Sequence, residues 1–311
     1  MSDPALAMYV RLYHYLGDGL TFEQTLACIA DETFDARVSE ACRALVEPVR
    51  LNGFEMQVLA QYPDLFPPVA RTMLWAGCQA GRVEDPIGVV ADDASLVLPQ
   101  TRAALGGEYP FLEMLECQLR FGVPQRVALG AIEAELKAKR AIEECAAMRA
   151  RVEGGEGIGD VLDSAPGLVP VPVPRLLRGI DEPPPFYNAL ALLARARSLG
   201  VTLRQDRHPG AAESLKRLFL LLPAAIAAGR TFADAIDLLA PHEAHDRLKA
   251  YLSSSSAKGP RRLAGTGEFP DLFAPPLRAV LDTCGSCTDG RIVEVCDRLM
   301  QGMARGLYLP G

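Results

Sequence analysis

Apolar residues recur along most of the chain with the period of an α-helix. Val38, Cys42 and Leu45 fall at positions i, i+4 and i+7, and Val46 and Val49 continue the same helix face. The two-residue alternation that marks a half-buried strand is almost absent. This pattern predicts an all-α fold.

Turn and capping residues divide the helical pattern into short pieces. Thr21 precedes Glu23 and Gln24, and its hydroxyl is suited to accept a backbone N–H at a helix start. Three glycines separate the expected helices, at positions where a positive φ or a tight turn is needed: Gly19, Gly53 and Gly81. We predict about six short helices in each stretch of this length.

The chain matches itself when it is shifted by 103 residues. Gly19 then meets Gly122, and Arg37 meets Arg140. The same shift also pairs the following residues: Leu26 with Leu129, Cys42 with Cys145, and Pro63 with Pro166. Because apolar positions and turn glycines recur together, this indicates a duplicated fold.

A third copy follows at a shift of 210 residues, which falls to 207 further along. Arg37 meets Arg247 at the first shift, and the tetrapeptide PDLF at 63–66 recurs at 270–273 at the second. The sequence therefore predicts three tandem helical-bundle repeats of about six short helices each, with boundaries at 1–106, 107–209 and 210–311.

Composition narrows the classes of function. The chain has 311 residues, 49% of them hydrophobic, which is ample for a buried core. The net charge of −7 argues against nucleic-acid binding, whose main source of affinity is neutralisation of phosphates. The longest apolar run, 219–228, contains Pro223 and is too short to span a bilayer, and Asp3 stands where a secretory signal carries basic residues. We therefore expect a cytoplasmic protein without a membrane-spanning segment.

Two irregular stretches interrupt the helical pattern. The segment LVPVPVP at 168–174 carries three prolines, which predict an extended polyproline connection rather than a helix. Residues 253–262 combine four serines with basic residues and read as a solvated loop. A proline-rich ligand motif in the first stretch and an anion-binding or regulatory site in the second are the less favoured alternatives.

Several segments of the repeat resemble motifs of a known family. Gly19–Leu26 reads GLTFEQTL, Gly155–Leu162 reads GEGIGDVL, Pro63–Pro67 reads PDLFP and Gly77–Val83 reads GCQAGRV. Together they resemble the F domain of type II secretion systems and type IV pilus systems, the cytoplasmic module of their inner-membrane platform protein. The resemblance touches all three repeats and is closest in the first.

The resemblance implies a helical bundle that packs against itself and against partner proteins, with no chemistry of its own. Two departures affect what it implies. The family usually carries two such domains with membrane-spanning helices, whereas this chain has three copies and none. Cys78 also stands where the last family motif has a glutamate, so a contact made by that glutamate is not expected here.

Residues with metal-binding or nucleophilic chemistry are few. Cys284 and Cys287 have the spacing of a zinc or redox pair, but no second pair of ligands follows them in the sequence. His242 and His245 lie three residues apart, unlike the two histidines of the H-E-x-x-H motif, and are expected at a solvated helix start. His14 lies among tyrosines of the first helix and is interpreted as a packed or interfacial side chain.

The remaining polar motifs point away from catalysis. The acidic pairs at 84–85, 92–93 and 181–182 have too few oxygen ligands for a divalent cation and are interpreted as solvated helix faces. Neither a phosphate-binding G-x-x-x-x-G-K-[ST] loop nor a G-x-S-x-G elbow is present. We therefore expect no cofactor, no metal and no enzymatic activity.

The combined hypothesis is a cytoplasmic scaffold or adaptor that acts through protein–protein interaction. By resemblance, its expected partners are a secretion or pilus ATPase or an inner-membrane platform component, and a homo-oligomer is the alternative to these partners. Candidate interface residues are Trp75, Phe66 and Phe273, although core packing is the favoured interpretation for the two phenylalanines. The alternatives are a regulatory helical array with unrelated partners and, less favoured, a metal- or thiol-dependent enzyme that uses Cys284, Cys287 and His14.

Overall fold

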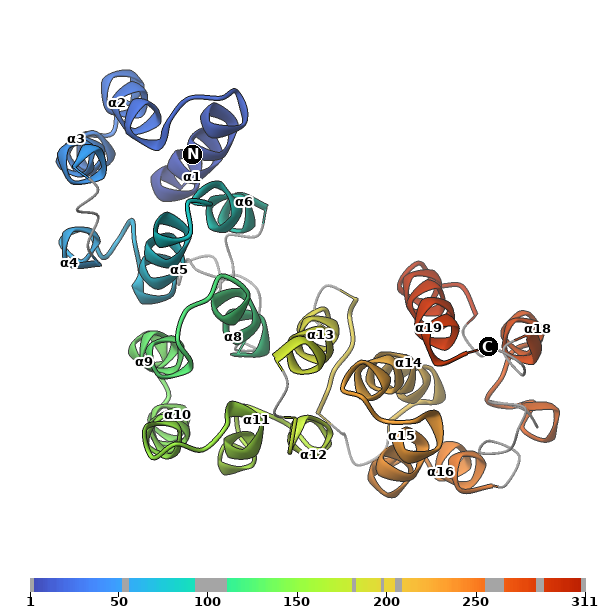
Figure 1. The fold of residues 1–311 in the computed structure, drawn as a ribbon. Helices are drawn as coiled ribbons and strands as arrows, with labels where there is room; N and C mark the ends of the chain where they lie inside the picture. Colours follow the sequence, from blue (N-terminus) through green and yellow to red (C-terminus); the bar gives the residue numbers. More distant parts are fainter. Residues whose placement is uncertain are drawn as a thin grey trace. The chain divides into compact units, whose positions relative to one another are not determined.

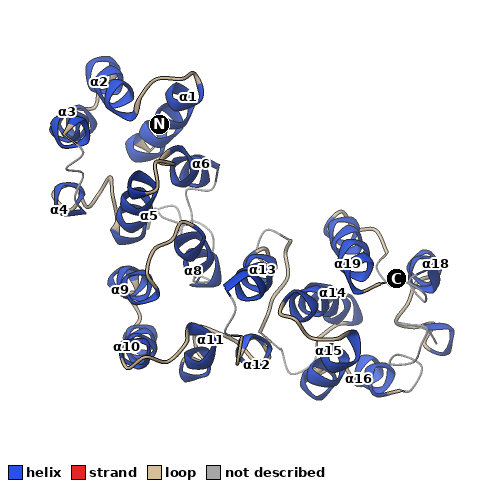
Figure 2. Cartoon of the chain, viewed as in Figure 1, coloured by secondary structure: helices blue, strands red, loops and turns tan. Residues whose placement is uncertain are grey.

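The computed structural model describes residues 3–51, 56–92, 111–180, 183–196, 199–204, 209–254, 266–283 and 288–308 (Figure 1). Within these ranges it contains 17 α-helices, three 3-10 helices and no strand (Figure 2). The predicted all-α class is therefore confirmed. Internal contacts divide the chain into two compact units, Met1–Gly154 (unit 1) and Gly155–Gly311 (unit 2).

Unit 1 is a series of helices that pack on their neighbours. The described helices are α1 (Pro4–Gly17), α2 (Phe22–Glu32), α3 (Ala36–Arg50), α4 (Met56–Leu59), α5 (Pro68–Gln79), α6 (Glu84–Asp92), α8 (Phe111–Arg120), α9 (Gln125–Glu135) and α10 (Lys139–Glu153). α1 lies against α6, and α2 lies against α3. α5 contacts both α8 and α9, and α9 contacts α10.

Unit 2 is built in the same manner around α14. Its described elements are α11 (Ile158–Val161), η2 (Leu162–Ser164), α12 (Val173–Leu177), α13 (Pro183–Ala194), α14 (Ala211–Ala227), α15 (Phe232–Leu239), η3 (Ala240–His242), α16 (Asp246–Ser253), η4 (Thr266–Glu268), α18 (Pro275–Thr283) and α19 (Asp289–Ala304). α14 contacts α13, α15 and α19. No helix in the described part of the chain is both long enough and apolar enough to cross a membrane.

Glycines in the left-handed region end the first helix of each predicted repeat. Gly19, Gly122 and Gly229 have φ values of +92°, +81° and +85°, a conformation that strains other residues. The N–H of Gly19 donates to the carbonyl of Leu16, and the following N–H reaches back to Tyr15, which satisfies carbonyls at the helix end. The expected turn glycines are thus confirmed at 19 and 81, whereas Gly53 lies outside the described residues.

Helices in the three parts of the chain begin at regularly related positions. α2, α9 and α15 begin at residues 22, 125 and 232, and α3, α10 and α16 begin at 36, 139 and 246. Both series are separated by the shifts of 103 and 210 that relate the sequence to itself. The boundaries at 106 and 209 stay a prediction, because contacts divide the described chain at Gly154, inside the predicted second repeat.

The expectation of an extended polyproline segment at 168–174 is wrong. Residues 168–172 form turns, and α12 begins at Val173 with Pro174 in its first turn. A proline is tolerated there because the first N–H groups of a helix have no partner within the helix, so the missing donor costs nothing. The apolar side chains of Val173 and Leu176, on either side of Pro174, are fully buried. This burial favours a compact connection over an extended one.

Buried polar groups hold α5 against α8 and α9. The residue before α5 is Pro67, whose side chain makes no capping hydrogen bond. Instead the Glu135 carboxylate at the end of α9, which is only 9% exposed, accepts the N–H of Val69 at 2.7 Å. Nearby, the Thr72 hydroxyl donates to the Gln118 side-chain oxygen at 2.7 Å. These bonds connect helices of the predicted first and second repeats within unit 1.

Replacing Glu135 tests whether this distant cap stabilises the helix start. Glu135→Ala is expected to lower the free energy of unfolding by about 1–2 kcal/mol, because a buried N–H of α5 loses its acceptor. Glu135→Gln keeps an oxygen acceptor and should lose less. Urea unfolding measures the difference, with Glu143→Ala on the exposed face of α10 as control. Equal losses at positions 135 and 143 would contradict the assignment.

Candidate interaction surface

The structure places two of the three predicted interface residues in the core. Phe66 is 1% exposed and packs edge-to-face against Tyr9, with ring centroids 6.2 Å apart. Phe273 is fully buried and packs against Tyr251 at 4.9 Å. Trp75 lies on α5 and is half-buried. Phe66 and Phe273 therefore contribute packing, and a partner cannot reach them in this conformation.

The most exposed large apolar residue among the described ones is Phe34, which the sequence did not single out. It lies in the short connection between α2 and α3, and its relative exposure of 105% means that no neighbour covers the ring. Isolated exposed apolar residues are common, but a phenylalanine that stands completely in solvent contributes nothing to the core of its own chain.

Hydrogen bonds on both sides fix the backbone that carries Phe34. On one side, the N–H of Thr33 donates to the carbonyl of Ile29 and closes α2. On the other, the Asp35 carboxylate accepts the N–H groups of Arg37 and Val38, both at 3.0 Å, and caps α3. The ring is therefore presented from a defined backbone rather than from a loose loop.

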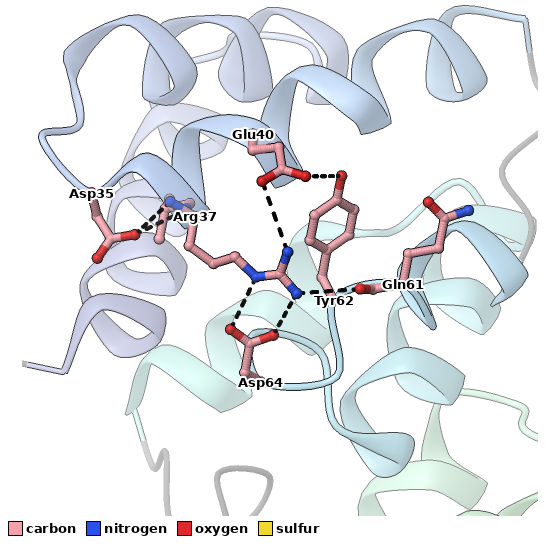
Figure 3. Close-up of polar contacts among 7 residues, drawn as sticks. Asp35, Arg37, Glu40, Gln61, Tyr62 and Asp64 are labelled. Atoms are coloured by element: carbon pink, nitrogen blue, oxygen red, sulfur yellow. Dashed lines mark hydrogen bonds and ion pairs between the residues drawn. The ribbon is translucent and has the colours of Figure 1, made fainter.

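Arg37 connects the start of α3 to the turn that follows α4 (Figure 3). Its guanidinium donates to both oxygens of Asp64, at 3.3 Å and 3.2 Å, and to the carbonyl of Gln61 at 3.3 Å. The same group stacks over the Tyr62 ring at 4.7 Å, and lies 3.8 Å from a Glu40 carboxylate oxygen. We call Phe34, Arg37, Glu40, Tyr62 and Asp64 the α2–α3 corner.

Electrostatics in the corner follow from this arrangement. The hydrogen bond from Arg37 holds the pKa of Asp64 below its usual value, because it stabilises the carboxylate. Burial, followed by the charge of Glu40, raises the pKa of the Tyr62 hydroxyl. Both side chains of the Arg37–Asp64 pair are about half exposed, so the pair is screened by water and contributes little stability by itself.

Unit 2 contains a matching pair without the exposed aromatic ring. Arg247 donates to both oxygens of Asp271, each at 3.0 Å, and lies over the Phe269 ring at 5.0 Å. In the predicted second repeat, the corresponding Arg140 instead pairs with Glu144 on its own helix, since position 167 is a glycine. At the shifts of 103 and 210, the positions that correspond to Phe34 hold Lys137 and Ala244. The exposed phenylalanine is thus specific to the first repeat.

The other residues considered in the sequence lie apart from one another. His14 is exposed on α1 beside Tyr13, whose ring centroid is 6.1 Å from its own. His245 is the first residue before α16, and its ring accepts the N–H of Leu248 at 3.4 Å, so the expected helix start is confirmed. Cys284 and Cys287, for which a metal or redox role was the less favoured alternative, lie outside the described residues.

No group of three or more potential metal ligands occurs within the described ranges. The buried thiols are also poorly suited to nucleophilic chemistry, because burial raises the pKa of Cys42 and Cys145 to about 12. Comparison of the chain with protein-family models, with curated proteins and with solved structures finds no match. The F-domain resemblance therefore stays an expectation based on the motifs themselves.

Two features of the sequence point to the α2–α3 corner. Phe34 falls between Thr33 and Asp35, two residues with capping chemistry, and outside the apolar pattern of either helix. Arg37 and Asp64 both recur at the shifts that give Arg247 and Asp271, which suggests that the two positions depend on each other. The contact between them required the folded chain, since 27 residues separate them.

The two recurring arginine–aspartate pairs predict a dependence of stability on pH. Because the pKa values of Asp64 and Asp271 lie below the usual 3.8, the pairs stabilise the fold above that pH and lose their effect as pH falls. The double variant D64N/D271N should show a shallower loss of melting temperature as pH falls from about 5 to about 2. Glu143→Gln is the control, and unchanged slopes in the double variant would contradict the prediction.

The buried thiols predict slow modification of the native protein. Burial raises the pKa of Cys42, Cys117 and Cys145 to about 12, so these thiols are protonated at pH 8 and their alkylation should require unfolding. Pulse labelling with iodoacetamide followed by peptide mass spectrometry measures this, with half-buried Cys28 as internal reference. Labelling of Cys42 as fast as Cys28 before urea is added would show that α3 opens readily.

Proposed function

We propose that this chain is a non-catalytic protein–protein interaction scaffold or adaptor that holds a partner through the α2–α3 corner of unit 1. The observation that carries the proposal is Phe34, a completely exposed aromatic side chain on a backbone fixed by two helix caps. Aromatic side chains and arginines are enriched among the residues that dominate binding energy at interfaces.

The physical advantage of this arrangement is preorganisation. Burying a phenylalanine ring against a partner contributes about 2 kcal/mol, and a fixed backbone reduces the entropy lost on binding. Arg37, three residues after Phe34 in the chain, is already paired with Asp64, so a partner that binds the corner need not neutralise that charge.

The machine that the scaffold serves is proposed from the resemblance. Three tandem F-domain-like repeats in a cytoplasmic chain suggest an adaptor for a type II secretion system or a type IV pilus. The proposed partners are its cytoplasmic ATPase or an inner-membrane platform component, with self-association as a further possibility. A regulatory helical array with unrelated partners is the alternative, because a fold does not determine a function.

Affinity purification from the source cells tests the proposal. The tagged full-length chain and its Phe34→Ala variant are purified in parallel from soluble and membrane fractions, and the captured proteins are identified by mass spectrometry. Loss of the ring should weaken the principal partner by about 2 kcal/mol, or roughly 30-fold, with the melting temperature unchanged. Lys137→Ala, at the position 103 residues further on, is the matched control.

The identity of the captured protein separates the two versions of the function. A secretion or pilus component that is lost with Phe34→Ala supports the proposed adaptor. An unrelated partner that is lost in the same way supports the regulatory array and ends the secretion-linked version. Equal capture by the original chain and the Phe34→Ala variant would remove the α2–α3 corner as the binding site.

A further inference from the structure

Three carboxylates flank the exposed ring of Phe34 in the chain. Asp31 and Glu32 form the end of α2, and Asp35 is the residue before α3. The side chain of Asp31 is 78% exposed, and Glu32 is exposed as well. All three lie within three residues of Phe34 in the sequence, so a partner that covers the ring also comes close to these acidic groups.

Two of these carboxylates lie where they do not help the fold. The C-terminal end of a helix carries partial negative charge from its carbonyl groups, which disfavours carboxylates and favours cations. The last turn of α2 nevertheless contains Asp31 and Glu32 and no basic residue. Arg43 lies 3.4 Å from Asp31, but both groups are largely exposed, so the pair contributes little stability. The Tyr15 hydroxyl donates to Glu32, a hydrogen bond that a neutral glutamine could also accept.

The other two predicted repeats form the same helix start without this charge. Neither has a carboxylate at the positions of Asp31 and Asp35, or an aromatic ring at the position of Phe34. The residues at these positions are Ala134, Ala138 and Lys137 at the shift of 103, and Pro241, His245 and Ala244 at the shift of 210. α10 and α16 still begin at the equivalent positions. The acidic charge therefore accompanies the exposed ring and is not required by the fold.

The charges around Phe34 are predominantly negative. Residues 31–43 and Asp64 of the α2–α3 corner together include five acidic and two basic side chains. Both basic groups are already engaged, because Arg37 is bound to Asp64 and Arg43 lies beside Asp31. A negative surface attracts cationic groups and repels nucleic acids, anionic membranes and a second copy of this chain, whose net charge is −7.

We propose that the partner of the α2–α3 corner is a basic protein surface, in which lysine or arginine side chains border an apolar pocket for the Phe34 ring. This inference rests on the proposed function, because it names the chemistry of the partner at the same site. Burial of the ring supplies binding energy, while Asp31 and Glu32 attract and orient the cationic groups. Carboxylates that weaken the end of α2 in the free chain are thereby explained by the complex.

Binding kinetics test the charge separately from the ring. The protein whose capture depends on Phe34 is purified, and its association with the full-length chain is measured by biolayer interferometry at about 50 and about 300 mM NaCl. The double variant D31N/E32Q should bind about 3- to 10-fold more weakly, mainly through slower association, and should depend less on salt. Its melting temperature should equal or exceed that of the original chain, because a repulsion at the end of α2 is removed.

The matched control is E143Q/E153Q, which removes two exposed carboxylates of α10 in the same unit and should bind like the original chain. A partner that depends on Phe34 but binds D31N/E32Q as tightly as the original chain would overturn the basic partner and leave the proposed function standing. Association of the unmodified chain that does not change with salt would overturn it as well. If no captured protein depends on Phe34, the α2–α3 corner is not a binding site and both proposals fail.

Discussion

The structure depends on finding hydrogen-bond acceptors for the starts of its many short helices. The first backbone N–H groups of each helix have no acceptor within that helix. A side chain just before the helix usually meets this need, as Thr21 does for α2. α5 is preceded by Pro67, which has no side chain able to accept, so the acceptor comes from Glu135 of α9. The requirement of one buried helix start thereby holds two predicted repeats together inside unit 1, and the contact between α5 and α9 follows from it.

The arginine–aspartate pairs meet a different need, which is to hold a turn against the start of a helix at the protein surface. Arg37 and Arg247 lie at equivalent helix starts and reach aspartates in equivalent turns, and each also covers an aromatic ring. Each pair is exposed to solvent and therefore contributes little stability. The second predicted repeat lacks the pair, because Gly167 has no carboxylate and Arg140 instead pairs with Glu144 on its own helix. Positions that contribute little stability are free to diverge between copies.

Phe34 and Arg217 depart from the usual placement of residues in opposite directions. One is an aromatic ring that lies entirely in solvent, and the other is a charged group that lies entirely out of it. Neither arrangement stabilises the isolated chain, since burial of the ring and solvation of the charge would each be favourable. Departures from local rules are often found at functional sites, and the exposed ring of Phe34 is the reason that the α2–α3 corner carries the proposal for binding.

The sequence by itself determined the helical class, the spacing of the helix starts and the glycine turns, because periodicity, capping and positive φ are local properties of a few neighbouring residues. Those features at Gly19 and Thr21 were predictable without any tertiary contact. The segment at 168–174 was not, because its prolines permitted a helix start as well as an extended chain, and burial of the valines and leucines chose between them. The exposure of Phe34, the burial of Arg217 and the cap from Glu135 were decided only by the folded chain, since solvent access and contacts across 66 residues arise when helices pack.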